Sequence, residues 1–294
     1  MSKFLFFAVI FFATAMEAAP VRVLVWDEQN KAQKKIYLDY ISAQIGSYLK
    51  TLPDLSVTIS GLGETNFGLS GGAISNCDVL VYWSHVRNKL IPDATAKEIV
   101  ERVREGKLAV VFLHSALTSK PFIEMMNERT REDAAKIIPA GTKTEFILPA
   151  AYKDPLPTDP ITPRIEMTHT PDGALLARVF LPICEIAAWR ETGEAVTIKT
   201  LLTNHPIAEG VPAQFEIPHT EVYSEPFHVP KPDAVIFQEE SSKGEIFRAG
   251  MLWQIGKGKV FYFSPGHETF PIYFEPAPLK IIGNAVEWLG EQRR

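Results

Sequence analysis

Short, almost uninterrupted runs of apolar residues constrain the fold of this chain more than any other feature of its sequence. Three of them cover residues 21–26 (VRVLVW), 78–83 (DVLVYW) and 108–113 (LAVVFL). Segments with apolar side chains at helical spacing lie between them, at residues 33–50 and 94–105. Strands that are apolar throughout are typical of parallel sheets whose two faces are covered by helices. The sequence therefore predicts an α/β fold with a mostly parallel sheet flanked by helices.

A proline-rich stretch interrupts this pattern. Residues 131–181 contain seven prolines and two short strand-like segments, at 144–148 and 175–180. Because proline cannot donate a backbone hydrogen bond, we expect an insertion that packs on the main domain and acts as a lid. We expect a single domain over residues 20–294. Its other segments are a strand at 57–61, a helix at 120–129, strands at 195–202, 234–239, 246–253 and 259–263 (the last two joined by a hairpin at Gly256 to Gly258), and a closing helix at 278–291.

The first 19 residues have the composition of a signal peptide. Lys3 precedes nine apolar residues, 4–12 (FLFFAVIFF), and small residues follow before Pro20. This stretch is shorter than the roughly 20 residues that a membrane-spanning helix needs. The sequence therefore predicts cleavage after Ala15, Ala18 or Ala19. It predicts a periplasmic or secreted protein with no stable membrane insertion once the signal is removed.

Charge and motif content exclude several functions. Thirty Lys and Arg residues face 35 Asp and Glu, the net charge is −5, and there is no long basic run, so nucleic-acid binding is disfavoured. The segment Gly61-Leu62-Gly63 lacks the third glycine of a dinucleotide site, and no P-loop is present, so no nucleotide cofactor is expected. Cys77 and Cys184 have no zinc or C-x-x-C spacing, and we expect two small buried residues whose pairing stays open.

Polar side chains follow three of the expected strands directly. The carboxyl ends of parallel strands meet at one edge of a sheet, which is where ligands bind in open α/β folds. The histidines among these side chains are therefore expected to converge, although a histidine at a strand end can also be an ordinary polar residue. The residues are His85 after Trp83-Ser84, His114 with Ser115, and His267 with Glu268.

Residues 217–227 (IPHTEVYSEPF) form a fourth polar segment, which contains His219, Glu221 and Tyr223. His219 and Glu221 are two residues apart, so on an extended chain both side chains point to the same face. A metal site or an acid/base pair needs that arrangement. A solvated strand face is the alternative interpretation.

Several ordered motifs resemble the ThuA-like (trehalose utilisation) family. They are Trp83-Ser84-His85, residues 108–116 (LAVVFLHSA), residues 219–227 (HTEVYSEPF), residues 244–271 (GEIFRAGMLWQIGKGKVFYFSPGHETFP) and Asn284-Ala285-Val286-Glu287-Trp288. The resemblance implies a flavodoxin-like, class I glutamine-amidotransferase-like fold. True amidotransferases carry a cysteine after the fourth strand, whereas this chain has His114, so cysteine glutaminase chemistry is not available. The resemblance also implies a role in the metabolism of trehalose or related disaccharides, through keto-sugars.

Two mechanisms for a keto-sugar isomerase, lyase or hydrolase stay open. In the first, His85, His219, Glu221 and His267 bind zinc or another first-row divalent metal, and His114 or Glu268 moves a proton. In the second there is no metal, and His114, His267 and Glu221 form an acid/base set that acts beside the ketone.

A protein that binds carbohydrate without catalysis is the alternative function. Trp83, Trp253, Tyr223 and Phe270 would then stack on sugar rings, while histidines bind hydroxyls. In either case the expected partner is a small sugar, with Trp83, Ser115 and Tyr223 as substrate contacts. The sequence leaves a homo-oligomer open.

Overall fold

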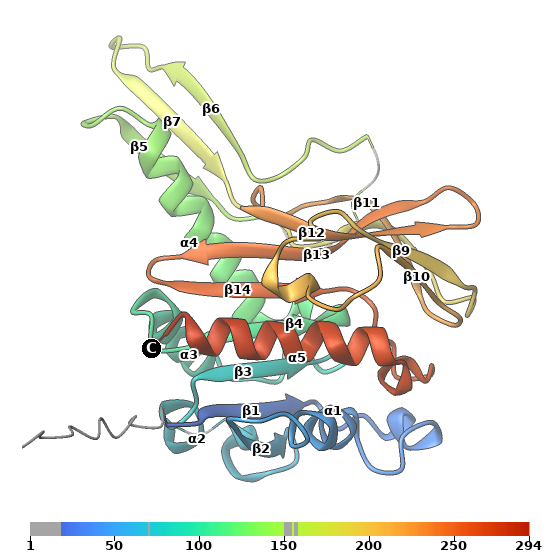
Figure 1. The fold of residues 1–294 in the computed structure, drawn as a ribbon. Helices are drawn as coiled ribbons and strands as arrows, with labels where there is room; N and C mark the ends of the chain where they lie inside the picture. The colour runs from blue at the N-terminus through green and yellow to red at the C-terminus, as the bar shows by residue number, and fades with distance from the viewer. Residues whose placement is uncertain (1–18, 70, 150–154, 156–157, 294) are drawn as a thin grey trace, which may run out of the picture.

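A nine-stranded sheet forms the centre of the protein (Figure 1). The computed structural model describes residues 19–69, 71–149, 155 and 158–293. The order of the strands in the sheet is β10-β9-β12-β13-β14-β4-β3-β1-β2. Their bounds are β1 Val21–Asp27, β2 Leu55–Gly61, β3 Val79–Trp83, β4 Ala109–Leu113, β9 Val196–Thr200, β10 Gln214–Ile217, β12 Ala234–Ser241, β13 Ile246–Ile255 and β14 Gly258–Phe263.

The sheet is mixed rather than mostly parallel. The strands β14, β4, β3, β1 and β2 run parallel, whereas β10, β9, β12 and β13 pair antiparallel with their neighbours. The predicted hairpin explains the change at β13 and β14, because a connection this short can only join antiparallel strands. Gly256 has a φ of 55°, and a Cβ there would lie 2.5 Å from the carbonyl oxygen of Arg104, so this turn requires glycine.

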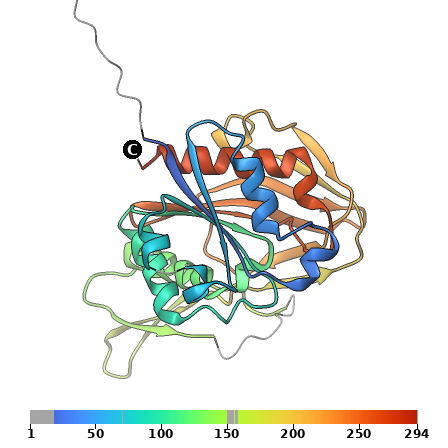
Figure 2. The same ribbon diagram turned by 90° about the horizontal axis from the view of Figure 1, so that it is seen from below.

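Helices cover both faces of the parallel half (Figure 2). Alternate residues of β1, β3 and β4 face opposite sides, so one set packs on α1 and α5 and the other on α3 and α4. The helices are α1 Ile41–Leu49, α2 Gly71–Ser75, α3 Asp93–Arg104, α4 Lys120–Ile137 and α5 Pro276–Glu291, and the short 3-10 helices are Lys31–Lys35, Thr65–Gly68, His114–Thr118, Pro206–Ala208 and Ile272–Phe274. Within the described ranges, no helix is long and apolar enough to cross a membrane.

The helix predicted at residues 33–50 is divided into two. A 3-10 helix ends at Lys35, and α1 begins only at Ile41. The break is fixed by side chains, because Gln33 Oε1 accepts the N–H of Ile41 at 2.7 Å and Asp27 Oδ2 accepts that of Ser42 at 2.7 Å. Asp27 stands at the end of β1, so it joins the strand to the start of the helix.

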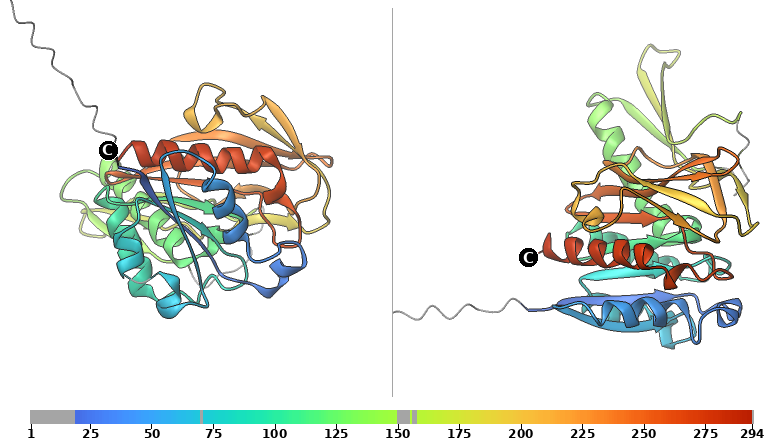
Figure 3. Two further views of the ribbon diagram at one scale, coloured as in Figure 1. Left: turned by 60° about the horizontal axis from the view of Figure 1, so that its bottom comes forward. Right: turned by 45° about the vertical axis from the view of Figure 1, so that its right-hand side comes forward.

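Two smaller sheets complete the fold. The strands β5 (Lys143–Ile147), β7 (Leu175–Phe180) and β6 (Arg164–His169) form a three-stranded sheet that projects from the side opposite to β1 and β2 (Figure 3). The strand β8 (Ile186–Arg190) pairs with β11 (Val222–Phe227). The segments predicted as strand-like at 144–148 and 175–180 correspond to β5 and β7. Residues 150–154 and 156–157 of the expected insertion lie outside the described residues, as does most of the expected signal peptide.

Candidate functional site

The carboxyl ends of three neighbouring strands bring three histidines together. His85 follows β3, His114 follows β4 and His267 follows β14, and β4 lies between the other two strands. The centroid of the His85 ring lies 5.2 Å from that of His114 and 4.8 Å from that of His267, and the last two are 5.3 Å apart. The sequence-based expectation that these side chains converge is therefore met.

His114 occupies a sharp turn from strand to helix. Its φ is 55°, which is a left-handed conformation that costs a residue other than glycine about 1–2 kcal/mol. Gly266 lies against this turn, and a Cβ there would overlap Tyr273 Oη and lie 3.0 Å from His114 Cβ. The imidazole is held inside the cluster by two features. They are the left-handed turn at His114 and the close approach of the loop after β14. The ring is buried.

The hydrogen bonds of His114 indicate its tautomer. Its Nδ1 lies 3.2 Å from the carbonyl oxygen of Ser264, which can only accept, so the ring donates its proton there. The Tyr223 hydroxyl lies 3.2 Å from the same Nδ1 and 2.7 Å from Ser115 Oγ. Burial, followed by the neighbouring imidazole groups of His85 and His267, lowers the pKa of His114 well below its usual value. The ring is therefore neutral, and its Nε2 carries a free lone pair.

Glu221 faces this lone pair. Its Oε2 lies 3.4 Å from His114 Nε2, and neither atom makes a hydrogen bond within the described part of the chain. Burial raises the pKa of Glu221 to about 7. A carboxyl group that is close to half protonated at neutral pH therefore lies beside an unprotonated ring nitrogen.

His85 forms a tight pair with Glu268. Its Nδ1 lies 2.7 Å from Glu268 Oε2, while Glu268 Oε1 accepts a hydrogen bond of 2.7 Å from Asn30 Nδ2. Burial disfavours charge on His85, but the bond to Glu268 together with the negative charges of Glu268, Glu221 and Glu28 raises the pKa of His85. Burial acts against charge on Glu268 as well, and the same bond lowers the pKa of Glu268. The pair thus favours an imidazolium with a carboxylate.

Glu28 holds the loop that carries His85. It is fully buried, and its carboxylate accepts the backbone N–H groups of His85 at 2.9 Å, Val86 at 3.1 Å and Arg87 at 2.7 Å. Glu28 was not among the residues predicted from the sequence. Its signal was an acidic Asp27-Glu28 pair directly after an apolar strand, the same kind of position that identified the histidines.

His267 and Glu268 stand next to each other in the chain, and both face the cluster. His267 Nδ1 lies 2.8 Å from the Thr269 hydroxyl, and its Nε2 lies 3.5 Å from Glu191 Oε1. Burial lowers the pKa of His267, which favours the neutral ring. Glu191 is a second residue that the sequence did not indicate.

Four of these side chains form a donor set that could hold a metal ion. The ligand atoms of His85, His114, His267 and Glu268 all lie within 4.8 Å of one another. Imidazole with carboxylate suits zinc and other first-row divalent metals. The fit is supported by His114, whose buried Nε2 has no partner while its Nδ1 is bound to a carbonyl, as in most metal-binding histidines.

The predicted metal set included His219 and Glu221, and the structure does not bring His219 to this place. His219 is exposed, and its Nδ1 faces the carbonyl oxygen of Gly193 at 3.0 Å. The reason is local, because His219 lies in the connection between β10 and β11 and not on an extended strand. The alternation that would align it with Glu221 does not apply there.

Two of the predicted sugar-stacking residues belong to the core. Trp83 is 1% exposed and donates its indole N–H to the carbonyl oxygen of Gly266 at 2.8 Å. Trp253 is fully buried and donates to the carbonyl oxygen of Pro230. Neither ring can contact a substrate, because each one fills the interior next to the sheet.

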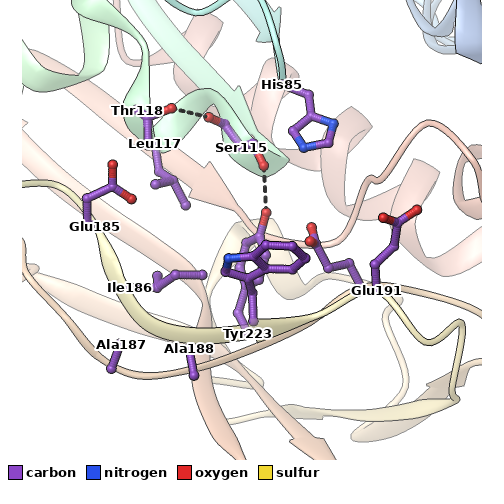
Figure 4. Close-up of a pocket in the computed structure, with 12 residues that line it drawn as sticks. His85, Ser115, Leu117, Thr118, Glu185, Ile186, Ala187, Ala188, Glu191 and Tyr223 are labelled. Atoms are coloured by element: carbon purple, nitrogen blue, oxygen red, sulfur yellow. Dashed lines mark hydrogen bonds between the residues drawn. The ribbon is translucent and has the colours of Figure 1, made fainter. Parts of the chain in front are cut away.

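A pocket of about 540 Å³ opens beside the cluster. In Figure 4, His85, Ser115 and Thr118 lie on one side, Ile186, Ala187 and Ala188 on the other, and the Tyr223 hydroxyl reaches Ser115. Ser115 and Tyr223, which the sequence predicted as substrate contacts, both line this pocket. The strand β8 forms the outer wall, and β5, β6 and β7 contribute nothing to it, so the described part of the expected lid is elsewhere. The lining residues are His85, Ser115, Leu117, Thr118, Glu185, Ile186, Ala187, Ala188, Trp189, Glu191, Glu221 and Tyr223.

Solved structures share this fold. A ThuA-like protein from Parabacteroides merdae ATCC 43184 is 16% identical over 92% of this chain and 90% of its own, with a TM-score of 0.57. A ThuA-like protein from Bacteroides uniformis ATCC 8492 is 12% identical over 95% of both chains, with a TM-score of 0.54. At these identities the likeness concerns the fold alone. Among curated proteins, no sequence matches the chain significantly.

The prediction of an exported protein, periplasmic or secreted, is not supported by the structure or by these comparisons. Residues 1–18, on which the prediction of a signal peptide depended, lie outside the described residues. We therefore withdraw the prediction of export.

A family profile gives the assignment. The profile described as ThuA, trehalose utilisation, matches residues 22–289, which include most of β1 and α5 and every member of the histidine cluster. The match is continuous, so the proline-rich segment lies within it. The chain therefore belongs to the ThuA family, which is described by its role in trehalose utilisation.

Proposed function

We propose that this protein is an enzyme of carbohydrate metabolism that acts on a keto-sugar at the histidine cluster. The observation that carries the proposal is the pair formed by His114 Nε2 and Glu221 Oε2, which are 3.4 Å apart, buried and without other hydrogen-bond partners in the described chain. Buried polar atoms are normally satisfied, and unsatisfied ones need an explanation. A reacting group or a bound ion at the edge of the pocket supplies one.

The donor set of His85, His114, His267 and Glu268 would hold a divalent first-row metal, and binding would release the proton that the His85–Glu268 pair holds. A metal ion bound there would polarise a carbonyl or hydroxyl oxygen of the sugar. Asn30 and the Ser264 carbonyl would orient these ligands through their bonds to Glu268 and His114. The position predicted for His219 is taken by His114.

Glu221 would move the proton. Its carboxylate takes the proton from a hydroxyl-bearing carbon next to the ketone, the electron pair of that C–H bond forms a C=C bond, and the π pair of the carbonyl moves onto its oxygen. The sugar is isomerised when the hydroxyl proton of the first carbon passes to this oxygen, the first carbon becomes the new ketone, and Glu221 returns its proton to the former carbonyl carbon. When a substituent leaves from the next carbon, the electron pair forms a C=C bond and the proton on Glu221 passes to the leaving oxygen.

Exchange of carbon-bound hydrogen tests this proposal without knowledge of the product. Methyl 3-dehydro-α-D-glucopyranoside, a glucoside with a ketone, would be incubated in deuterium oxide, and proton NMR would follow the signals next to the ketone. The wild-type protein should accelerate their loss, and Glu221→Gln should reduce this acceleration at least about 100-fold. His219→Ala, an exposed histidine outside the cluster, is the matched control and should exchange like the wild type.

Two results contradict the proposal. If Glu221→Gln exchanges as fast as the wild type, Glu221 is not the base. If the wild-type protein binds the keto-glucoside but never exchanges or converts it, the protein is a carbohydrate-binding protein and not an enzyme.

A further inference from the structure

Trp189 lies directly opposite Tyr223 in the antiparallel pair of β8 and β11. Side chains at directly opposed positions lie on the same face, with Cβ atoms about 4.5–5.5 Å apart. The Tyr223 hydroxyl contacts His114 and Ser115, so the register places Trp189 beside the cluster. Both Trp189 and Tyr223 line the pocket.

The Trp189 indole is unlike those of the other tryptophans. It is 58% exposed, and within the described residues no hydrogen bond or ring contact involves it. Its exposure therefore has no structural explanation within the fold. The other four have partners: the N–H groups of Trp26, Trp83 and Trp253 donate to the carbonyl oxygens of Phe67, Gly266 and Pro230, and Trp288 packs against His205 and Lys259.

The strand that carries Trp189 is held firmly. Arg190, the next residue, donates to Glu245 at 2.7 Å and to Glu194 at 2.9 Å. Glu191, which also lines the pocket, has its Oε1 3.5 Å from His267 Nε2 and 3.3 Å from Thr269 Oγ1. An apolar ring surface and a carboxylate acceptor thus lie side by side on a firmly held wall of the pocket.

We infer that Trp189 is the stacking platform for a ring of the sugar substrate. The C–H face of a pyranose packs on the indole, while the indole N–H and the Glu191 carboxylate bind ring hydroxyls. A rigid aromatic side chain gives large contact area at small entropic cost. The inference rests on the proposed function, since it assigns the substrate of that same site a cyclic sugar rather than an open-chain one.

Calorimetric titration tests it with methyl α-D-glucopyranoside and trehalose, which lack the ketone that the proposed reaction requires. Sorbitol, with hydroxyls but no ring face, is the ligand control. Trp189→Ala should weaken binding of both sugars at least about tenfold, whereas Trp189→Phe should stay within about threefold of the wild type. Trp288→Phe is the matched control and should bind like the wild type. Circular dichroism checks that each variant is folded.

The outcomes separate the inference from the proposed function. If Trp189→Ala binds both sugars as tightly as the wild type, or sorbitol binds as tightly as they do, the inference is wrong, while hydrogen exchange by the wild type would keep the proposed function. If the wild-type protein neither binds sugars nor exchanges hydrogen, the proposed function is wrong and the inference is lost with it.

Discussion

His114 Nε2 and Glu221 Oε2 lie 3.4 Å apart, and each is buried without another hydrogen-bond partner in the described residues. The two side chains come from distant parts of the chain, one from the turn after β4 and the other from the residue before β11. Nearby groups such as His114 Nδ1 and the loop of His85 are held by hydrogen bonds that involve the backbone. In contrast, His114 Nε2 and Glu221 Oε2 can interact only with each other or with a ligand. The site therefore has its unsatisfied atoms where the pocket meets the cluster.

His114 and Glu221 should act as one unit. In a double-mutant cycle on the hydrogen-exchange rate, His114→Ala combined with Glu221→Gln should be no slower than the slower single variant, because removal of either partner already disables the other. The control cycle pairs Glu221→Gln with His219→Ala, for which the effects should add. Additive effects in the first cycle would show that the two residues act independently.

Glu28 should be required to position His85. Glu28→Gln leaves one accepting oxygen for the three N–H groups that the carboxylate binds, so we expect a loss of about 1–3 kcal/mol in the free energy of unfolding. The exchange rate should fall as well, since the His85 loop is no longer fixed. Chemical denaturation measures the first effect, and Glu98→Gln, on the exposed face of α3, is the control. Unchanged stability and unchanged exchange would contradict this role.

Gly266 should be needed for the loop after β14 to reach His114. A Cβ at this position overlaps Tyr273 Oη, so Gly266→Ala should cost about 1–3 kcal/mol of stability, and Tyr273→Phe in the same chain should restore part of it. Gly72→Ala is the matched control, because a Cβ there meets nothing within 4 Å. Thermal unfolding midpoints of the wild type, the two single variants and the double variant measure these effects. A Gly266→Ala variant as stable as Gly72→Ala would be evidence against this contact.

Glu239 should make stability depend on pH. It is fully buried behind the site, where Ser264 Oγ lies 3.4 Å from its Oε2, and burial raises its pKa from 4.5 to about 8. The folded protein therefore holds a proton that the unfolded chain releases above pH 4.5, so the stability that Glu239 provides at low pH is lost as pH rises toward 8.

Glu239→Gln mimics the protonated carboxyl and removes this dependence. The variant should match the wild type near pH 4.5 and be more stable by about 1–3 kcal/mol at pH 8, as measured by urea unfolding across that range. Glu240→Gln, whose carboxylate pairs with Lys199 at 2.6 Å on the surface, should show no such gain. If the difference in the free energy of unfolding between Glu239→Gln and the wild type does not grow with pH, Glu239 is not buried as an uncharged carboxyl.

The sequence predicted the elements that the parallel sheet is built from, because strands covered on both faces are apolar throughout and leave a clear pattern. It also located His85, His114 and His267, since strand ends converge by topology alone. The mixed sheet was missed because pairing direction depends on the path of each connection rather than on strand composition. The extra strand β6 lacks a hydrophobic pattern, as most of its side chains are exposed.

Residues on connections could not be placed in the same way. His219 and Glu221 were expected on one face, but the turn before β11 sends His219 to solvent and Glu221 inward. Trp83 and Trp189 look equivalent as aromatic residues in the sequence, and only the packing distinguishes the core residue from the pocket residue. Glu28 and Glu191 were missed because their partners are loops that come from elsewhere in the chain.

The metal content of the purified protein shows whether the histidine cluster is a metal site. The wild-type protein, His267→Ala and His219→Ala would be purified without chelator or added metal, and elemental analysis would measure first-row metals per chain. Close to one divalent metal ion per chain is expected in the wild type and in His219→Ala, with a loss of most of it in His267→Ala. Absence of metal from the wild type, or equal metal in all three proteins, would contradict a metal site formed by His85, His114, His267 and Glu268.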